Sequence, residues 1–180
     1  NTLKRKFAFI SAKRFNELLE AAIAKASVTE YSPAFLKAEW EAIVNFRGID
    51  NEETYLHASR KGRGTRLGVR QRRAIWRVFA EFLAVLEEKH YMTWERLCFR
   101  VATELAEQPP LYAQVIADEA QDLGPAEFRL LRTLVAPGDN DLFLCGDAGQ
   151  RIYQPRFSWK AAGIDVRGRA TRLTVNYRTT

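Results

Sequence analysis

The segment that most constrains the fold is Val115 to Asp122, which reads Val-Ile-Ala-Asp-Glu-Ala-Gln-Asp. The apolar run Tyr112 to Ala117 has the length and β-branched content of a buried parallel strand. Open α/β sheets place ligands and catalytic groups at the carboxyl ends of such strands, where Asp118 and Glu119 fall. Because burying two carboxylates is costly unless a cation neutralises them, the pair predicts a Mg²⁺ site. The alternative is an acidic turn before the helix that follows at Gly124.

Two more apolar runs end in polar segments. Asp141 to Cys145 predicts a second buried strand, and it leads into Gly146 to Tyr153, where two glycines allow a tight turn and close approach to a bound group. Arg172 to Val175 predicts a third strand, which leads into Asn176 to Thr180. The side chains in these segments that suit phosphate contact or stacking on a base are Gln150, Tyr177 and Arg178.

Together, the three polar segments resemble three motifs of the UvrD/Rep-type superfamily 1 DNA helicases, in the same order. Asp118-Glu119-Ala120-Gln121-Asp122 resembles the second motif of that family, Gly146-Asp147-x-x-Gln150-x-Ile152-Tyr153 the third, and Asn176-Tyr177-Arg178-Thr179-Thr180 the fourth. The motifs lie in the last two-fifths of the chain. The first three-fifths match only in kind, as a helical insertion that the family carries before its second motif.

The resemblance implies ATP and Mg²⁺ as cofactors and a role for each matched residue. Asp118 would bind Mg²⁺, and Glu119 would be the general base that activates water. Gln150 would contact the γ-phosphate and couple it to the DNA site. Tyr177 would stack on the adenine, and Arg178 would act as an arginine finger, a group typically worth roughly 10³ to 10⁵ in rate.

The resemblance also implies that an aromatic side chain soon after the Ile-Tyr pair stacks on single-stranded DNA. Here Tyr153 is followed by Gln-Pro-Arg, so the stacking residue is either Phe157 or Trp159. A base stacked on an aromatic ring contributes about 1–3 kcal/mol. For each ring the alternative is a position in the hydrophobic core. Asp147 has two readings as well: it lies near the metal, or it caps the turn after Gly146.

The whole chain of 180 residues has a net charge of +6, and a basic stretch lies in its first half. There is no acid between Thr54 and Ala80, and glycines punctuate the beginning of the stretch. A mobile basic loop leading into a helix suits contact with the phosphates of duplex DNA, although a solvated basic face is the simpler explanation. The predicted contacts are Arg60, Lys61, Arg63, Arg66, Arg70 and Arg73.

The rest of the first half predicts helices with apolar stripes. Ser11 caps a helix to about Ala26, Ser32-Pro33 starts one that ends near Gly48, and Thr93 starts another. A long helix runs from about Gly68 to His90. The stripes place Trp40, Trp76 and Trp94 in the core. These helices and the three strands predict an α/β fold class that is predominantly helical. The family resemblance implies its organisation: a DNA-contacting helical insertion subdomain, residues 1–110, then part of a RecA-like P-loop NTPase parallel sheet, residues 111–180.

Composition bounds the class of protein. With 47% hydrophobic and 28% charged residues the chain can bury a core. Two cysteines and two histidines give neither a disulfide framework nor a zinc spacing, and they suggest a reducing cytoplasm. No apolar run reaches about 18 residues, so no membrane span is expected. No Gly-x-x-x-x-Gly-Lys-Ser/Thr loop occurs; we therefore expect an internal piece of a longer motor, unable by itself to hydrolyse ATP.

Three functions remain open at this point. The first is an ATP-dependent translocase that binds single-stranded DNA and the duplex junction, for which the resemblance implies 3′ to 5′ polarity; its protein partners are unknown. The second is a non-catalytic nucleic-acid-binding module derived from a helicase. The third is a two-metal nuclease site built from Asp118, Glu119, Asp122 and Asp147, which would leave Gln150 without a role.

Overall fold

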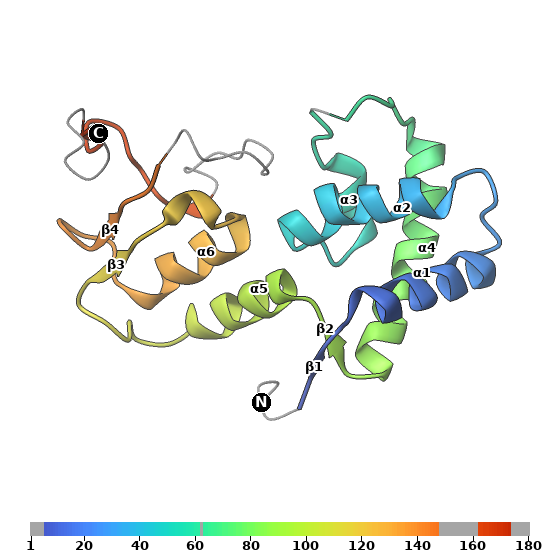
Figure 1. Ribbon diagram of the computed structural model, residues 1–180, viewed down its shortest axis with the longest axis horizontal. Coiled ribbons are helices and arrows are strands. Elements are labelled where there is room, and N and C mark those ends of the chain that lie inside the picture. Colours follow the sequence, from blue (N-terminus) through green and yellow to red (C-terminus); the bar gives the residue numbers. More distant parts are fainter. Residues whose placement is uncertain (1–5, 62, 148–161, 174–180) are drawn as a thin grey trace, which may run out of the picture.

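The computed structural model describes residues 6–61, 63–147 and 162–173 of the chain. They form two parts that lie side by side, one made of helices and one built around a small parallel sheet (Figure 1). The helical part contains α1 (Ala12–Ala26), α2 (Pro33–Glu39), the π-helix η2 (Trp40–Asn45), α3 (Glu52–His57) and α4 (Val69–Glu88). The other part contains α5 (Trp94–Leu105), β3 (Val115–Ala117), the 3-10 helix η3 (Ala120–Asp122), α6 (Pro125–Leu134) and β4 (Leu142–Leu144). A parallel pair of short strands, β1 (Ala8–Phe9) and β2 (Tyr91–Met92), lies where the two parts join.

The helices begin at the capping residues that the sequence predicts. The hydroxyls of Ser11, Ser32 and Thr93 each accept a hydrogen bond from the backbone N–H three residues later, at 3.2–3.3 Å. Each bond satisfies one of the donors that the first turn of a helix leaves free. Pro33 follows its cap at the first helical position, where its fixed φ suits the helix. The helices predicted from these caps are confirmed, and the predicted long helix is α4.

Aromatic rings from three helices hold the helical part together. The Trp40 ring of η2 meets the Phe82 ring of α4 edge to face, with centroids 4.8 Å apart, and Phe15 of α1 lies 4.9 Å from Phe82. All three side chains are buried. Edge-to-face pairs add to the free energy that burial of the rings already contributes. Trp76 is buried in the same cluster, so the core positions predicted for Trp40 and Trp76 are confirmed.

Trp94 corrects the core prediction. Its side chain is 53% exposed, and its ring lies 6.1 Å from that of Phe9, which is itself exposed. Helical spacing predicts that Trp94 shares a face of α5 with Cys98 and Ala102, both of which are buried. The spacing does not say how far along that face a neighbouring element covers the helix. Trp94 is the first residue of α5, at the junction between the two parts, and it stays open to solvent.

The sheet of the second part pairs β3 with β4 in parallel, with Val115 opposite Leu142 and Ala117 opposite Leu144. Leu142 and Leu144 pack in a cluster with the buried Phe128 of α6. On the other face Ile116 is 76% exposed and Phe143 62% exposed. The sequence predicted strands buried on both faces, and for these two residues that prediction is wrong. An apolar run indicates a strand, but the elements that pack around it decide which faces they cover.

The predicted strands are also shorter in the structure. The runs 112–117 and 141–145 contain three-residue strands, and most of the predicted third strand, 172–175, lies outside the described residues. Helix α5, which precedes Pro109-Pro110, packs against α6. Within the described ranges no helix combines the length and the hydropathy that crossing a bilayer would require.

Candidate functional site

The carboxyl ends of β3 and β4 meet at one edge of the sheet, as the parallel pairing requires. The Cys145 N–H donates to the carbonyl oxygen of Ala117 at 3.0 Å, and the Ala120 N–H donates back to the carbonyl oxygen of Cys145 at 2.8 Å. The segment after β3 is therefore bonded to the segment after β4. The ends of the two predicted strands, Ala117 and Cys145, therefore lie at the same edge of the sheet. The third predicted strand end, Val175, lies outside the described residues.

Asp118 is the first residue after β3, and one of its carboxylate oxygens is held in place. Oδ1 accepts a hydrogen bond from the Cys145 thiol at 3.0 Å and another from the backbone N–H of Glu119 at 2.8 Å. The thiol bond first, and then the backbone bond, lower the pKa of the Asp118 carboxyl below its ordinary value. The side chain is exposed, and none of the described residues donates to Oδ2. Within the described ranges, Asp118 thus presents an ionised carboxylate with one oxygen open.

Glu119 follows in a backbone conformation that glutamate seldom adopts. Its φ is +51°, in the left-handed region, which costs a non-glycine residue of order 1 kcal/mol or more. The bonds of its neighbours, from the Glu119 N–H to Asp118 and from the Ala120 N–H to Cys145, hold this turn. Its side chain is exposed, and its Oε2 accepts a hydrogen bond from Nε2 of Gln121 at 2.5 Å. The two carboxylates therefore leave the strand end with separate, defined partners.

The segment after β4 approaches this turn closely enough to need a glycine. A Cβ added to Gly146 would lie 2.3 Å from Oε1 of Gln121 and 3.0 Å from the backbone nitrogens of Ala120 and Gln121. The next N–H, that of Asp147, donates to the same Oε1 at 2.9 Å. The close approach predicted for the first glycine of this motif is thus to another loop of the protein itself. No role was predicted for Gln121, although its place in the second motif was the available signal.

The acids of the site do not form a metal cage. Among the described residues no group of three or more His, Cys, Asp or Glu side chains is placed to hold a metal ion. The four-acid constellation considered for a two-metal nuclease is therefore not present in that part of the chain. Mg²⁺ bound together with a nucleotide needs only one or two carboxylates, because phosphate oxygens and waters complete its shell. The open oxygen of Asp118 fits this mode of binding.

Several predicted site residues lie outside the described residues. They are Gln150, Tyr153, Phe157, Trp159, Tyr177 and Arg178.

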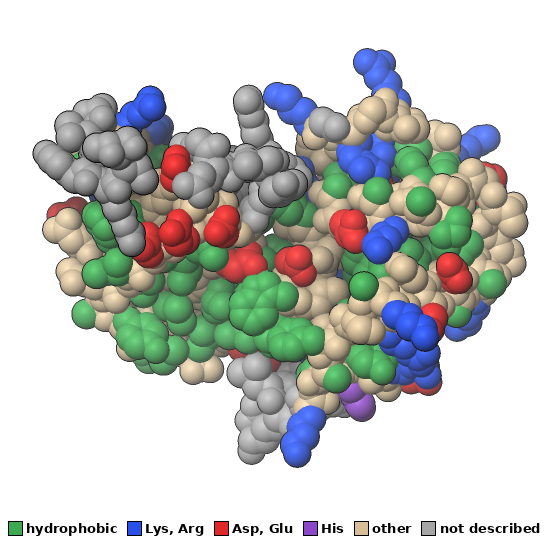
Figure 2. All heavy atoms as spheres, in the orientation of Figure 1, with side chains coloured by type: hydrophobic (Ala, Val, Ile, Leu, Met, Phe, Trp, Pro, Cys, Tyr) green, Lys and Arg blue, Asp and Glu red, His purple; other side chains and the backbone are tan. Residues whose placement is uncertain are grey.

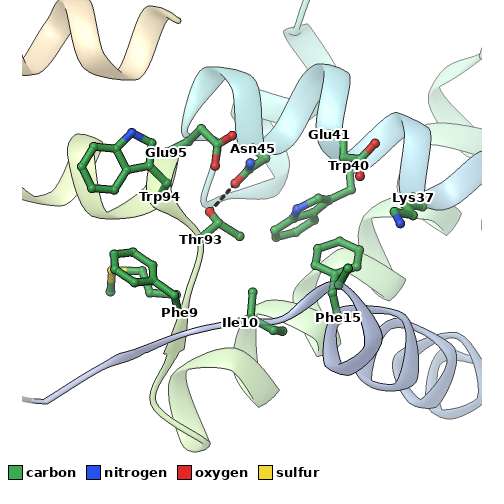
Figure 3. A pocket seen from close by; sticks show the side chains of 12 residues that line it. Phe9, Ile10, Phe15, Lys37, Trp40, Glu41, Asn45, Thr93, Trp94 and Glu95 are labelled. Carbon is green, nitrogen blue, oxygen red and sulfur yellow. Dashed lines mark hydrogen bonds between the residues drawn. The ribbon is translucent and has the colours of Figure 1, made fainter. Parts of the chain in front are cut away.

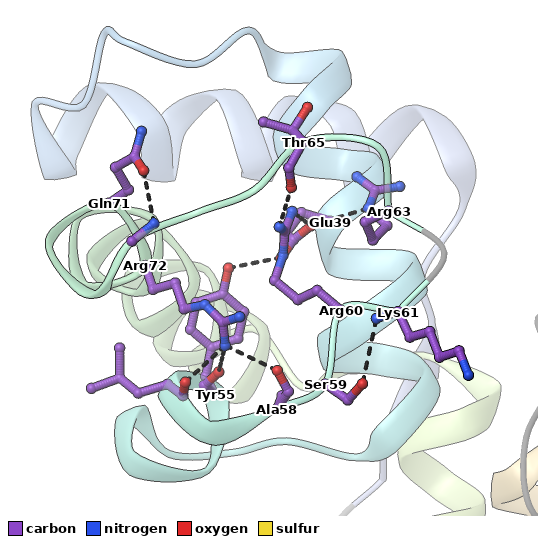
Figure 4. A network of polar contacts seen from close by, with 12 residues as sticks. Glu39, Tyr55, Ala58, Ser59, Arg60, Lys61, Arg63, Thr65, Gln71 and Arg72 are labelled. Atoms are coloured by element: carbon purple, nitrogen blue, oxygen red, sulfur yellow. Dashed lines mark hydrogen bonds and ion pairs between the residues drawn. The ribbon is translucent and has the colours of Figure 1, made fainter.

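The basic stretch of the helical part is organised around one buried acid (Figure 4). Glu39, at the end of α2, is fully buried, and Arg60 contacts both of its oxygens, at 2.6 and 2.8 Å. Arg63 donates to Glu39 Oε2 at 3.2 Å, and the Tyr55 hydroxyl donates to Oε1 at 3.0 Å. Burial by itself would raise the pKa of the Glu39 carboxyl, but the bonds and the charge of Arg60, followed by Tyr55 and Arg63, lower it. Arg60 also donates to the carbonyl oxygen of Thr65, which ties the loop onto this acid.

The predicted DNA contacts fall into two groups, those whose side chains are bonded to Glu39 and those whose side chains are exposed to solvent. Arg60 and Arg63 are occupied by Glu39, and their side chains are only 6% and 24% exposed. Arg72, a further cation of the stretch, donates to the backbone carbonyls of Leu56 at 2.7 Å and Ala58 at 2.9 Å. These bonds cap the carboxyl-terminal end of α3. Figure 2 shows basic side chains standing out along the top of the helical part, where Figure 1 places the α3–α4 loop. The exposed cations of the stretch are Lys61, Arg66, Arg70, Arg73 and Arg77.

An apolar groove of about 660 Å³ lies between the two parts (Figure 3). The exposed rings of Phe9 and Trp94 flank one side of it, and Trp40 lies on the other. A hydrogen bond of 2.7 Å from the Thr93 hydroxyl to Asn45 Oδ1 crosses between β2–α5 and η2. The sequence carried no signal for this groove because its lining comes from separate elements.

Comparison with known proteins identifies a matching family. A family model described as the UvrD/REP helicase N-terminal domain matches residues 1–167, a range that includes the helical part, the strand ends and the loops after them. No curated protein and no solved structure matches the chain.

Proposed function

Because the chain belongs to the UvrD/REP helicase family, we propose that it works in an ATP-dependent DNA translocase, which couples ATP hydrolysis to movement along single-stranded DNA and to duplex unwinding. The family is the one predicted from the three motifs, and that prediction is confirmed. The proposal has three finer parts: the protein hydrolyses ATP, it moves along DNA, and it moves in the 3′ to 5′ direction. They rest on the family and on the motif residues.

One observation supports the proposal most strongly: Asp118 and Glu119 leave β3 at the edge where the loop after β4 joins them. In this arrangement Asp118 would hold Mg²⁺ through its open Oδ2 and would keep Oδ1 on the Cys145 thiol and the Glu119 N–H. The ion, when bound, would supply charge neutralisation at the phosphates. Glu119 would accept the proton of the attacking water, since its carboxylate is exposed and projects from the same turn.

The remaining roles in ATP hydrolysis are proposed from the motif match alone. Gln150 would contact the γ-phosphate, Tyr177 would stack on the adenine, and Arg178 would stabilise charge on the transferred phosphoryl group. Stacking on single-stranded DNA would come from Tyr153 and from Phe157 or Trp159. All six residues belong to the third and fourth motifs or to the segment that follows the third.

For contact with duplex DNA we propose the exposed cations of the α3–α4 loop and of the first turns of α4, namely Lys61, Arg66, Arg70 and Arg73. Each phosphate neutralised by such a side chain releases counterions and makes binding weaken with salt. Arg60 and Arg63 were also predicted as contacts, but their guanidinium groups already contact Glu39. They would contribute to DNA binding indirectly, by holding the loop that carries the exposed cations.

Replacing the proposed general base tests the activity directly. In the full-length protein, Glu119→Gln should lower kcat for DNA-stimulated ATP hydrolysis by about 10²- to 10⁴-fold, because the amide cannot accept the proton from water. The dissociation constant for ATP, measured by titration with a fluorescent analogue, should stay the same. Glu107→Gln, an exposed glutamate after α5, is the matched control and should turn over ATP at the wild-type rate. Wild-type turnover in Glu119→Gln would remove Glu119 from this role.

The exposed basic surface also fits a second function, a nucleic-acid-binding module without ATPase activity. It would keep the cations of the α3–α4 loop and make no use of Asp118 and Glu119. Wild-type protein that binds DNA but hydrolyses no ATP, with or without DNA, would favour this second function over the first.

A further inference from the structure

Gln121 lies at the strand edge, and its side-chain amide bonds to both loops of the site. It is 9% exposed, so its amide is largely shielded from water. Its Nε2 donates to Oε2 of Glu119 at 2.5 Å, and its Oε1 accepts from the Asp147 N–H at 2.9 Å. The amide therefore joins the carboxylate after β3 to the backbone after β4.

Only a side chain of this length that both donates and accepts can make this bridge. An ionised glutamate at position 121 could accept from Asp147 but could not donate to Glu119, and a methionine of similar length could do neither effectively. The bond to Glu119 is charge-assisted, and such bonds are about twice as strong as neutral ones. The amide therefore fixes one oxygen of the Glu119 carboxylate and leaves the other available.

The bridge sits where the two loops come closest. Gly146 leaves no room for a Cβ beside Oε1 of Gln121, and the Ala120 N–H donates to the carbonyl oxygen of Cys145 at 2.8 Å on the adjoining backbone. A displacement of the Gly146–Asp147 backbone would therefore pull on Oε1 of Gln121. Because Nε2 belongs to the same planar amide, that movement would turn the donor that holds Glu119.

We propose that Gln121 is the positioning residue for Glu119 and that it passes movement of the Gly146–Asp147 loop to the Glu119 carboxylate. Gln121 touches no reacting atom in this arrangement; it acts through Glu119. The inference deepens the proposed function and rests on it for its catalytic meaning. The two hydrogen bonds can still be tested without catalysis.

Three substitutions in the full-length protein separate the two bonds. Gln121→Met removes both, Gln121→Glu replaces the donor to Glu119 with a like charge but keeps an acceptor for Asp147, and Gly146→Ala leaves Gln121 intact but crowds its Oε1. All three should lower kcat for ATP hydrolysis about 10- to 100-fold, the value of a hydrogen bond to a charged group, with an unchanged KM for ATP. Gln108→Glu and Gln108→Met, at an exposed glutamine after α5, are the matched controls and should leave kcat unchanged.

Hydrogen exchange at the Asp147 amide, followed by NMR, gives the second readout. Exchange should become faster in Gln121→Met but should stay slow in Gln121→Glu, which keeps the acceptor. A purely structural role would instead lower the thermal midpoint and leave kcat per folded molecule unchanged. Unchanged kcat in Gln121→Glu together with unchanged exchange in Gln121→Met would overturn the proposal. If the wild-type protein hydrolyses no ATP, the proposed function fails, and the exchange data alone then decide whether the bridge exists.

Discussion

Glu39 and Asp118 are acids whose surroundings differ in every respect that matters for their charge. Glu39 is fully buried, and its two oxygens receive hydrogen bonds from Arg60, Arg63 and Tyr55. Asp118 is exposed and stands next to another acid, and among the described residues it accepts hydrogen bonds from a thiol and a backbone N–H. In the described part of the chain, no lysine or arginine forms an ion pair with Asp118.

The difference separates a structural charge from a functional one. The pKa of both carboxyl groups lies below its ordinary value, so both are ionised at neutral pH. At Glu39 burial opposes ionisation, but the hydrogen bonds and positive charge of the arginines outweigh it. The buried carboxylate is therefore neutralised by side chains of the protein itself and needs no ligand. At Asp118 weak donors stabilise the charge on Oδ1, and no donor from the described part of the chain reaches Oδ2. An open carboxylate of this kind is suited to bind a cation.

Removal of the buried charge should have the largest effect on stability. Glu39→Gln leaves Arg60, whose side chain is 6% exposed, without a counter-charge, and we expect the free energy of unfolding to fall by about 3–5 kcal/mol. Urea denaturation followed by circular dichroism measures this. Glu41→Gln, two residues further on at an exposed position, should change the unfolding free energy little. Equal effects of the two substitutions would contradict a structural role for the Glu39 charge.

Acid should reproduce part of that loss in the wild-type protein. Since the pKa of Glu39 is lower in the folded than in the unfolded state, its contribution is fully present above the unfolded value, about 4.3. The contribution is lost as the pH falls through the folded value, because protonation then costs the folded state its ion pairs. Urea midpoints measured from pH 6 downward should therefore fall more steeply for wild type than for Glu39→Gln. Parallel curves would show that other groups dominate the acid transition.

The smallest effect on stability is expected at the exposed acid. Asp118→Asn keeps an oxygen that can accept from Cys145 and from the Glu119 N–H but loses the charge, so the urea midpoint should not change measurably. Nucleotide binding that depends on Mg²⁺ should weaken, whereas binding measured with EDTA should not. A large drop in the urea midpoint would mean that Asp118 belongs to the same structural class as Glu39.

Local chemistry made the helices predictable. A hydroxyl at Ser11, Ser32 or Thr93 can bond to the first turn of a helix whatever the rest of the chain does, and each predicted start is where a helix begins. The strand end at Ala117 was predictable for a similar reason. Two acids directly after an apolar run are typical of the carboxyl end of a parallel strand, where ligands bind. The positions of Gln150 and Arg178 stay predictions from the motifs.

Burial and pairing were less predictable, because they depend on residues distant in the chain. The spacing of Trp94 resembles that of Trp40, yet one is exposed and the other is not. Likewise Arg60 and Arg66 belong to one basic run, but only Arg60 lies beside Glu39, 21 residues away. A charge count cannot separate a cation that faces solvent from one that neutralises a buried acid.

The order and chemistry of the motifs, the helix starts and the family were already contained in the amino-acid sequence, because each depends on residues close together in the chain. The folded chain alone decided that Gln121 joins Glu119 to Asp147, that Gly146 must lack a side chain beside it, and that Arg60 and Arg63 serve Glu39. These features arise where separate segments meet, at distances where one added carbon atom or one missing proton changes the contact.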